Sequence, residues 1–272
     1  MYKIIKKKQL NDLVFSLTVE APYTARKALA GQFVIMRANE RGERIPLTVA
    51  DYDREKGTIT VILQKAGKAT GLLSELSEGD YIKDLTGPLG IPSRLDGYEK
   101  VCVIGGGVGC AIAYPVAKAL FEKGVDFDVI AGFRSKDMII LEDEFKSMCK
   151  NFYITTDDGS YGYKGFVTQK LTELIEDGAG YDLIIAIGPV PMMKFVCKIS
   201  EPLGIKTTVS LNPIMIDGTG MCGCCRVTVD GKIKFACVDG PDFDGHKVDF
   251  DELINRNTAY TEQEKHDCNL LI

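Results

Sequence analysis

Four residues near the C-terminal end have types and spacing that suit an iron–sulfur centre. They are Asp217, Cys222, Cys225 and Cys237, spaced as residue-x4-Cys-x2-Cys-x11-Cys. This is the spacing of plant-type 2Fe–2S centres, with aspartate at the first ligand position. Thiolates suit iron, and the intervening glycines (Gly218, Gly220 and Gly223) let a loop wrap a compact inorganic core. The pattern predicts a 2Fe–2S cluster, which transfers single electrons.

A structural zinc site is the alternative that these cysteines allow. It would use Cys222, Cys224, Cys225 and Cys237. Structural zinc sites usually combine two CxxC-like knuckles separated by a longer spacer, and only one knuckle is present here. The spacing therefore favours the cluster, with Asp217 as a ligand and Cys224 as a bystander. The extra thiol nevertheless leaves the fourth ligand open between these two residues.

The amino-acid composition indicates which classes of protein this chain resembles. The chain has 272 residues, 45% hydrophobic and 26% charged, with a net charge of −5, which is typical of a globular protein with two compact domains and an appendage. The acidic balance gives no indication of nucleic-acid binding. The apolar stretch 101–117 is broken by glycines and Pro115, so no transmembrane segment is expected. Nine cysteines without a signal peptide favour a cytoplasmic protein, although Cys268 has no evident partner.

The chain divides into three parts by its pattern of strands and helices. Short β-branched runs separated by turn signals predict a small antiparallel barrel over residues 1–97, with a helix near 70–76 and a tight turn at 87–90. Alternating strands and helices predict a parallel-sheet nucleotide-binding α/β domain over residues 98–210. Residues 211–272 hold the cysteine loop and form the predicted cluster-binding segment.

A glycine-rich turn indicates a dinucleotide site in the second part. It follows a predicted strand and opens a helix, and consists of Gly105, Gly106, Gly107, Val108 and Gly109. A helix N-terminus in this context binds pyrophosphate, although Cys110 stands where GxGxxG has its third glycine. Gly188 and Pro189 end a later strand and are expected at the same sheet edge. Arg134 and Lys136 follow the second strand, where positive charge weakly favours NADPH over NADH.

Two stretches of the barrel suit a flavin. Arg44 precedes the strand run Pro46, Leu47 and Thr48, whose backbone and threonine hydroxyl would meet a flavin ring. Gly67 to Thr70, including Ala69, places backbone N–H groups at a helix N-terminus, ready for a diphosphate. Each stretch alone is more often an ordinary strand start or helix cap. Together, ahead of a nucleotide domain and a cluster motif, they predict a flavin site.

The order of a small barrel, a nucleotide domain and a C-terminal 2Fe–2S loop resembles the ferredoxin–NADP reductase superfamily. The chain is more similar to the electron-transfer subunit of dihydroorotate dehydrogenase B, and more similar still to the small subunits of NADH-dependent reduced ferredoxin:NADP oxidoreductase. The most specific part of the resemblance is Asp217 within residues 212–222, because the dihydroorotate enzyme's subunit has four cysteines there.

The resemblance implies roles for individual barrel residues. Pro46, Leu47 and Thr48 match the strand that binds the isoalloxazine ring, with Thr48 the candidate catalytic residue. Leu63, Gln64 and Lys65 match the second flavin strand, and Gly67 to Thr70 match the diphosphate turn. The family's flavin-phosphate arginine aligns with Ile45, one position after Arg44, and a shift of one residue on a strand turns a side chain to the other face.

The resemblance also implies a function. It is electron transfer between NAD(H), FAD and a 2Fe–2S cluster, passing electrons to a larger flavin and iron–sulfur subunit of a ferredoxin:NAD(P) oxidoreductase, with electron bifurcation as a further role of the complex. Ferredoxin would be reached through that complex. The family favours NAD(H), with NADP(H) as the alternative. Two other functions stay open: electron delivery to dihydroorotate dehydrogenase, and a non-catalytic metal-binding adaptor, which would lack flavin absorption bands.

Overall fold

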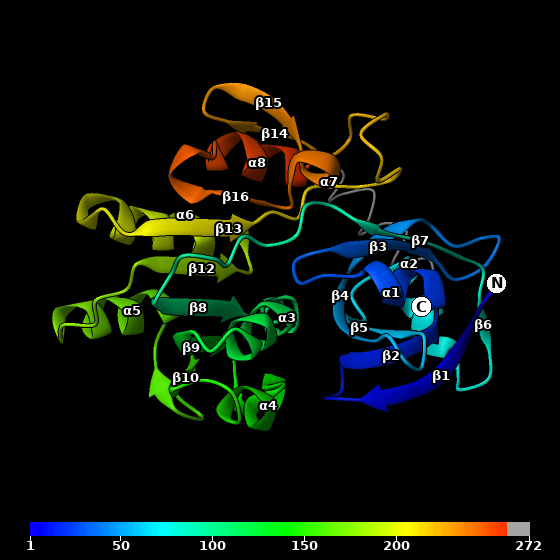
Figure 1. The fold of residues 1–272 in the computed structure, drawn as a ribbon, viewed down its shortest axis with the longest axis horizontal. Helices are drawn as coiled ribbons and strands as arrows, with labels where there is room; N and C mark the ends of the chain where they lie inside the picture. The colour runs from blue at the N-terminus through cyan, green and yellow to red at the C-terminus, as the bar shows by residue number, and fades with distance from the viewer. Residues whose placement is uncertain (260–272) are drawn as a thin grey trace.

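The computed structural model describes residues 1–259 as a barrel, an α/β domain and a C-terminal segment. Figure 1 shows the barrel on the right in blue to cyan, the α/β domain on the left in green to yellow, and the C-terminal segment at the top in orange and red. Cys268 lies outside the described residues. Among residues 1–259, none of the helices combines the length and the apolar character that crossing a bilayer requires.

The barrel is one antiparallel seven-stranded sheet. Its strands are β1 (Tyr2–Gln9), β2 (Val14–Glu20), β3 (Phe33–Arg37), β4 (Ile45–Asp53), β5 (Thr58–Gln64), β6 (Tyr81–Ile82) and β7 (Asp84–Leu89). They pair in the order β6-β1-β2-β5-β4-β3-β7, so the hydrogen-bonded sheet stays open between β6 and β7. Helices α1 (Pro22–Lys27) and α2 (Lys68–Glu75) complete this part of the chain.

Side-chain alternation explains the barrel core. In β5, Ile59, Val61 and Leu63 are buried and the residues between them are half-buried, because successive side chains of a strand point to opposite faces. The prediction of a tight turn at residues 87–90 is wrong. Strand β7 continues through Leu89, which pairs with Phe33 of β3. These residues are extended because β3 supplies hydrogen-bonding partners for β7, and the local sequence contains no sign of that pairing.

The α/β domain is built on a mixed seven-stranded sheet. Its strands are β8 (Lys100–Gly106), β9 (Asp126–Phe133), β10 (Asn151–Thr156), β11 (Tyr163–Lys164), β12 (Leu183–Ile187), β13 (Lys206–Ser210) and β16 (Asp242–Asp244), in the order β11-β10-β9-β8-β12-β13-β16. All pairs are parallel except β13 with β16. The expected parallel sheet is therefore confirmed, with one antiparallel edge strand added from the C-terminal segment.

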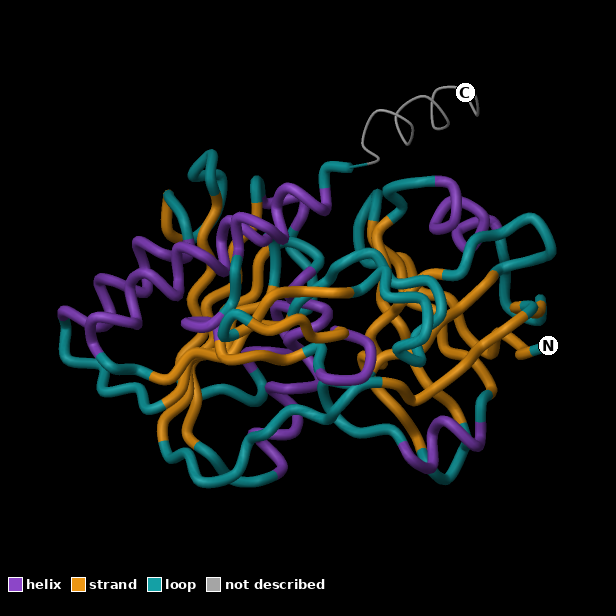
Figure 2. Tube along the Cα trace, turned by 90° about the horizontal axis from the view of Figure 1, so that it is seen from above, coloured by secondary structure: helices purple, strands orange, loops and turns teal. Residues whose placement is uncertain are grey.

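Helices cover both faces of this sheet, as Figure 2 shows. They are α3 (Gly109–Glu122), α4 (Glu142–Lys146), α5 (Val167–Glu176) and α6 (Val190–Ser200), with short 3-10 turns η1 (Lys136–Met138), η2 (Glu201–Leu203) and η3 (Gly245–Lys247). In β8, Val101 and Val103 join the core under α3 and α4, whereas Cys102 and Ile104 join the core under α5 and α6. This burial on both faces explains the continuous apolar run of the strand.

The C-terminal segment packs on the α/β domain. It contains β14 (Arg226–Val229), β15 (Lys232–Phe235), α7 (Ala236–Asp239), β16 and α8 (Phe250–Asn257). Phe250 and Leu253 of α8 are buried in the same apolar cluster as Val196 of α6 and Cys237 of α7. The cysteine-bearing elements are therefore held by a shared hydrophobic core.

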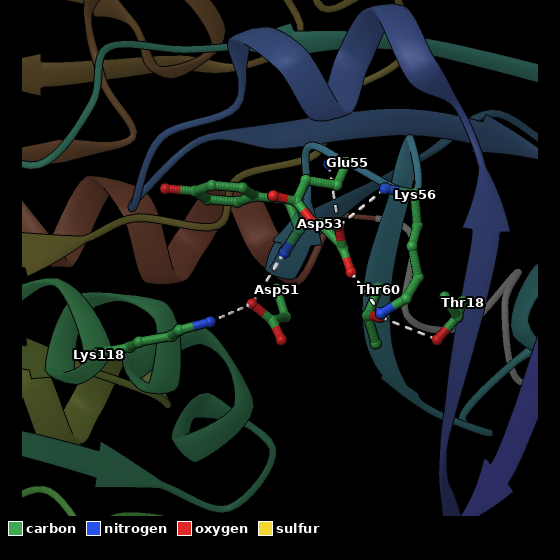
Figure 3. A network of polar contacts seen from close by, with 8 residues as sticks. Thr18, Asp51, Asp53, Glu55, Lys56, Thr60 and Lys118 are labelled. Atoms are coloured by element: carbon green, nitrogen blue, oxygen red, sulfur yellow. Dashed lines mark hydrogen bonds and ion pairs between the residues drawn. The ribbon is translucent and has the colours of Figure 1, made fainter.

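The barrel and the α/β domain meet along helix α3. Lys118 of α3 donates to Oδ1 of Asp51 in β4 at 2.6 Å, a contact drawn in Figure 3. Val14 of β2 is buried in the cluster that contains Cys110 and Ala111 of α3. Asn11 also donates to the carbonyl of Met138 at 3.2 Å. These contacts fix how the barrel faces the N-terminus of α3.

Candidate functional site

The glycine turn between β8 and α3 has the shape that a dinucleotide needs. Gly107 adopts a left-handed backbone with φ of +56°, and a Cβ there would meet no atom within 4 Å, so the space above it is open. A Cβ on Gly109 would lie 2.4 Å from the carbonyl oxygen of Ile187, so only glycine allows α3 to approach β12. Gly109 therefore supplies the close helix–strand packing that the missing third glycine of GxGxxG would provide.

Two cavities open at this turn. One, of about 550 Å³, lies between the barrel and the α/β domain and is lined by Leu13, Val14 and Gln64 on one side and by Gly106, Gly107, Val108, Gly109, Arg134, Gly188 and Pro189 on the other. Ser210 and Asn212 are also part of its lining. The structure thus brings Gln64, expected on the second flavin strand, to the same cleft as the expected nucleotide residues.

The second cavity extends along the carboxyl ends of β9 and β10. It is also about 550 Å³ and shares Gly106, Gly107, Arg134 and Pro189 with the first. Its further lining includes Thr155, Asp157, Phe166, Met192 and Phe195. Phe166 and Phe195 remain 60% and 55% exposed, and the buried hydroxyl of Thr155 has no hydrogen-bond partner within residues 1–259. An apolar cavity with a few polar groups suits a nucleoside.

Charge in the second cavity differs from the sequence-based expectation. Of the basic pair after β9, only Arg134 lines the cavity. Lys136 instead has its ammonium 5.6 Å from the centre of the Tyr161 ring. The carboxylate of Asp157, after β10, shares the cavity with Arg134. An acidic side chain at a nucleotide ribose favours NAD(H) over the 2′-phosphorylated form. Of the two basic residues on which the preference for NADPH was based, Lys136 does not line the cavity.

The expected flavin residues lie on neighbouring parts of the barrel. Pro46, Leu47 and Thr48 of β4 are all half-buried in succession, which departs from strict alternation and leaves one stretch of strand uncovered. Leu63 is buried inside the barrel, so only its backbone is available to a ligand, whereas Lys65 is exposed. Among the flavin candidates, Gln64 is the one that lines the interdomain cleft.

The turn before α2 has an uncovered helix N-terminus. The Thr70 hydroxyl accepts hydrogen bonds from the N–H groups of Ala66 and Gly67, each at 3.0 Å. Ala69 is nearly buried, and a Cβ added at Gly67 would meet no atom within 4 Å. The first N–H groups of a helix lack intrahelical partners and attract anions. The geometry therefore suits a diphosphate at this position.

A β-hairpin brings two of the candidate cluster ligands together. Strands β14 and β15 pair with Arg226 opposite Phe235, and the N–H of Ala236 donates to the carbonyl of Cys225 at 3.0 Å. The sulfur atoms of Cys225 and Cys237 consequently lie 3.1 Å apart, both buried. Two thiolates on one tetrahedral metal with bonds of about 2.3 Å would lie roughly 3.7 Å apart. This pair is therefore close to the spacing that one iron requires.

The loop of residues 217–225, the cluster loop, carries the other candidates. Cys222 is exposed, and hydrogen bonds from the backbones of Cys224 and Asp217 lower the pKa of its thiol. Thr219 donates its hydroxyl and its N–H to Asp217, and these bonds lower the pKa of that carboxyl. Burial raises the pKa of Cys237 to about 12, so a metal must displace its proton on binding.

Within residues 1–259, no three histidine, cysteine or acidic side chains converge on a point that could hold a single metal ion. The candidates form a close pair, Cys225 with Cys237, and a neighbouring exposed group around Cys222. A donor set of thiolates with one carboxylate, wrapped by a glycine-rich loop, fits iron bound in a cluster, which takes ligands at more than one metal.

The cluster loop rests on the barrel. A Cβ on Gly218, where φ is +85°, would lie 2.8 Å from Leu89 and 2.9 Å from Ile35, so glycine permits the loop to touch β7 and β3. Nε of Arg44 donates to the carbonyl of Ile216 at 3.1 Å. Arg44 thus contacts the residue that directly precedes the cluster loop. Different elements of the barrel therefore border the interdomain cleft and contact the cluster loop.

Comparisons with known proteins agree with this architecture. Residues 212–249 match the iron–sulfur cluster binding domain of dihydroorotate dehydrogenase B, and residues 103–198 match the oxidoreductase NAD-binding domain. A Thermotoga maritima protein described as a homologue of the dihydroorotate dehydrogenase B (NAD⁺) electron transfer subunit is 49% identical, covering 97% of this chain and 93% of its own. The chain belongs to this family of electron-transfer subunits.

More distant and structural relatives support the same assignment. The electron transfer subunit of Geobacillus thermodenitrificans dihydroorotate dehydrogenase B (NAD⁺) is 32% identical over 90% of this chain and 96% of its own. A chain from the structure of NADH-dependent reduced ferredoxin-NADP oxidoreductase, studied for flavin-based electron bifurcation, is 47% identical with a TM-score of 0.93, covering 100% of this chain and 98% of that one. A ferredoxin reductase of carbazole 1,9a-dioxygenase, 20% identical with a TM-score of 0.62 over 75% of this chain and 64% of its own, shares the fold.

The expected ferredoxin-reductase-like fold, the NAD-binding oxidoreductase domain and the iron–sulfur segment are thereby confirmed. The sequence analysis did not identify Thr155, Asp157, Phe166 and Phe195 as residues of the candidate nucleotide site. They come from three separate elements, so they form no motif in the sequence. The sequence analysis also missed the hairpin that joins the cysteines. Asp230-Gly231, both with positive φ, is a recognisable hairpin signal between β14 and β15.

Proposed function

We propose that this chain is the electron-transfer subunit of a ferredoxin:NAD(P) oxidoreductase complex, taking up electrons from NADH and delivering them singly to a larger flavin-containing subunit. The observation that carries the proposal is the position of the barrel. The barrel borders the interdomain cleft through Gln64. It also contacts the cluster loop through Ile35 and Leu89, and the residue before that loop through Arg44. A redox group held by the barrel would therefore lie between a two-electron donor and a one-electron acceptor.

The bound groups would be noncovalent FAD, NAD(H) and a 2Fe–2S cluster. When bound, the flavin and the cluster supply the conversion between hydride chemistry and single-electron transfer, which nicotinamide alone cannot perform. The protein's own part is to bind and orient them. Pro46 to Thr48, Leu63 to Lys65 and Gly67 to Thr70 would hold FAD, and the Thr48 hydroxyl is proposed to contact the flavin ring.

The nucleotide would be held by the turn before α3 and by the second cavity. N–H groups at the α3 N-terminus would bind the pyrophosphate. Asp157 would accept hydrogen bonds from a ribose, and the exposed rings of Phe166 and Phe195 would contact the adenine. NADH is the proposed donor, because the carboxylate of Asp157 would repel a 2′-phosphate.

The cluster would be held by Asp217, Cys222, Cys225 and Cys237. The aspartate supports a ferredoxin:NAD(P) complex over electron delivery to a dihydroorotate dehydrogenase, the second candidate, which the family match and the 32% identical relative favour. A partner is proposed because the cluster loop presents Cys222 and the side chain of Met221, 88% exposed, at the surface.

The proposal is tested by purifying the chain with whatever subunit accompanies it. The expected preparation contains extractable FAD and iron, shows flavin absorption bleached by NADH, and includes a larger flavin-containing partner. The chain alone should bleach with NADH but sustain no reduction of NADP or ferredoxin. Folded protein without flavin would instead support a metal-binding adaptor, and co-purification with a dihydroorotate-oxidising subunit would support the second candidate.

A further inference from the structure

Arg256 is the one arginine of the C-terminal helix α8, and it lies in the last turn of that helix. The helix is firmly placed on the cluster-bearing elements. Asp249 accepts the N–H of Glu252 at 2.9 Å and caps its start, Asp251 forms an ion pair with Lys194 of α6 at 2.6 Å, and Leu253 is buried. The position of the Arg256 backbone is therefore fixed by packing and not by the loop it faces.

The guanidinium of Arg256 reaches the cluster loop. Its Nη2 donates to the carbonyl of Cys224 at 3.2 Å in a partly buried contact. Cys224 stands between the candidate ligands Cys222 and Cys225. Arg256 and Cys224 are 32 residues apart in the sequence, so this charged hydrogen bond joins the helix to a distant part of the chain.

The charge of Arg256 is not neutralised within the described chain. None of the ion pairs among residues 1–259 includes it. Its Nε is buried and has no hydrogen-bond partner there either. A buried unpartnered donor is costly and calls for a reason, because burial removes the water that would otherwise solvate it. A half-buried cation directed at a loop of candidate iron ligands has an electrostatic effect on whatever negative charge the loop holds.

We propose that the charge of Arg256 raises the reduction potential of the iron–sulfur cluster, a role that rests on the proposed cluster site. A cluster gains one negative charge on reduction, and a nearby cation stabilises the reduced form more than the oxidised form. The hydrogen bond to the Cys224 carbonyl keeps the guanidinium near the loop. Arg256 would therefore make the cluster a better acceptor of electrons from the barrel.

The test uses the full-length chain with its cluster loaded. Arg256→Gln removes the charge and keeps an N–H donor, Arg256→Lys keeps the charge, and Lys232→Gln removes an exposed cation from the far end of the β14–β15 hairpin as a matched control. The midpoint potential of each is measured by redox titration followed by EPR, with iron content and flavin content as independent readouts.

The expected result is a midpoint potential shifted to more negative values in Arg256→Gln, with wild-type iron content. Arg256→Lys and Lys232→Gln should keep the wild-type potential. An unchanged potential in Arg256→Gln, or an equal shift in Lys232→Gln, overturns the inference. Loss of iron in Arg256→Gln but not in Arg256→Lys, with no shift in the residual signal, would also overturn it by assigning Arg256 to cluster retention. Absence of any iron–sulfur EPR signal from wild type would instead count against the proposed function.

Discussion

Lys118 and Asp51 form an ion pair between the α/β domain and the barrel. The ammonium of Lys118, in helix α3, lies 2.6 Å from Oδ1 of Asp51, in strand β4. The N-terminus of α3 faces the interdomain cleft, and β4 also carries Pro46 to Thr48. The ion pair therefore connects the helix proposed to bind the nucleotide with the strand proposed to bind the flavin.

Breaking this ion pair should affect reaction geometry more than stability. Both side chains are only half-buried, so the pair is partly screened by water and Lys118→Met should cost less than about 1 kcal/mol of unfolding free energy. Small misplacements of reacting groups are far more costly to rate. We expect Lys118→Met to slow flavin reduction by saturating NADH, measured by stopped flow, with little change in NADH affinity. Lys123→Met breaks another ion pair, between the residue that directly follows α3 and Asp96, and should leave the rate unchanged. Equal slowing in both variants would contradict this.

Cluster ligation should depend on Asp217 and not on Cys224. Adjacent side chains diverge, so only one of Cys224 and Cys225 should bind a small cluster, and the sulfur of Cys225 already lies 3.1 Å from that of Cys237. Cys224→Ser should retain the EPR signal and iron content. Asp217→Cys should keep a cluster with an altered potential, and Asp217→Ala should make it labile to chelators. A cluster lost in Cys224→Ser and unchanged in Asp217→Ala would assign the fourth ligand to Cys224.

Gly107→Val should block nucleotide binding without unfolding the domain. The new side chain would project into the open space above the turn and would strain a backbone with φ of +56°. NADH affinity, measured by titration of the flavin spectrum, should fall at least tenfold, while flavin content stays at the wild-type level. Gly178, also with positive φ and open surroundings but after α5, offers a matched control as Gly178→Val. Wild-type NADH affinity in Gly107→Val would place the pyrophosphate elsewhere.

Asp157 should set the preference between the two nicotinamide cofactors. Its carboxylate and Arg134 line the same cavity, and removing the negative charge leaves the cation unopposed. Asp157→Asn should raise the NADPH-to-NADH ratio of flavin reduction rates, and Arg134→Gln should lower it. The neighbouring Asp158, whose carboxylate accepts the N–H of Ser160 at 2.9 Å and does not line the cavity, is the matched control as Asp158→Asn. A wild-type ratio that favours NADPH would show that Arg134 has a stronger effect on cofactor preference than Asp157.

Arg44→Ala should disturb the cluster loop and spare the flavin. The Arg44 side chain donates to the Ile216 carbonyl, so its loss frees the start of the loop. We expect faster iron loss under chelation and unchanged FAD content, compared with Arg41→Ala, which alters an exposed residue nearby. Loss of FAD in Arg44→Ala would restore this residue to the flavin site, which its position just before Pro46 to Thr48 first suggested.

The sequence by itself determined the three-part order, the strands with strong alternation and the chemistry of the cluster motif. Strand β12 (Leu183–Ile187) is a continuous apolar run because both of its faces are buried, and such a run is visible without a structure. Metal-ligand spacing is also local information, since Asp217, Cys222 and Cys225 lie within one loop.

Tertiary structure alone decided which distant groups meet. The pairing of Cys225 with Cys237 depends on the β14–β15 register, the path of β7 depends on hydrogen bonds offered by β3, and the cavity of Asp157 is assembled from the ends of several strands and helices. The contact of Arg256 with Cys224 spans 32 residues. No local pattern encodes such contacts, because each depends on the packing of apolar faces that are remote from it in sequence.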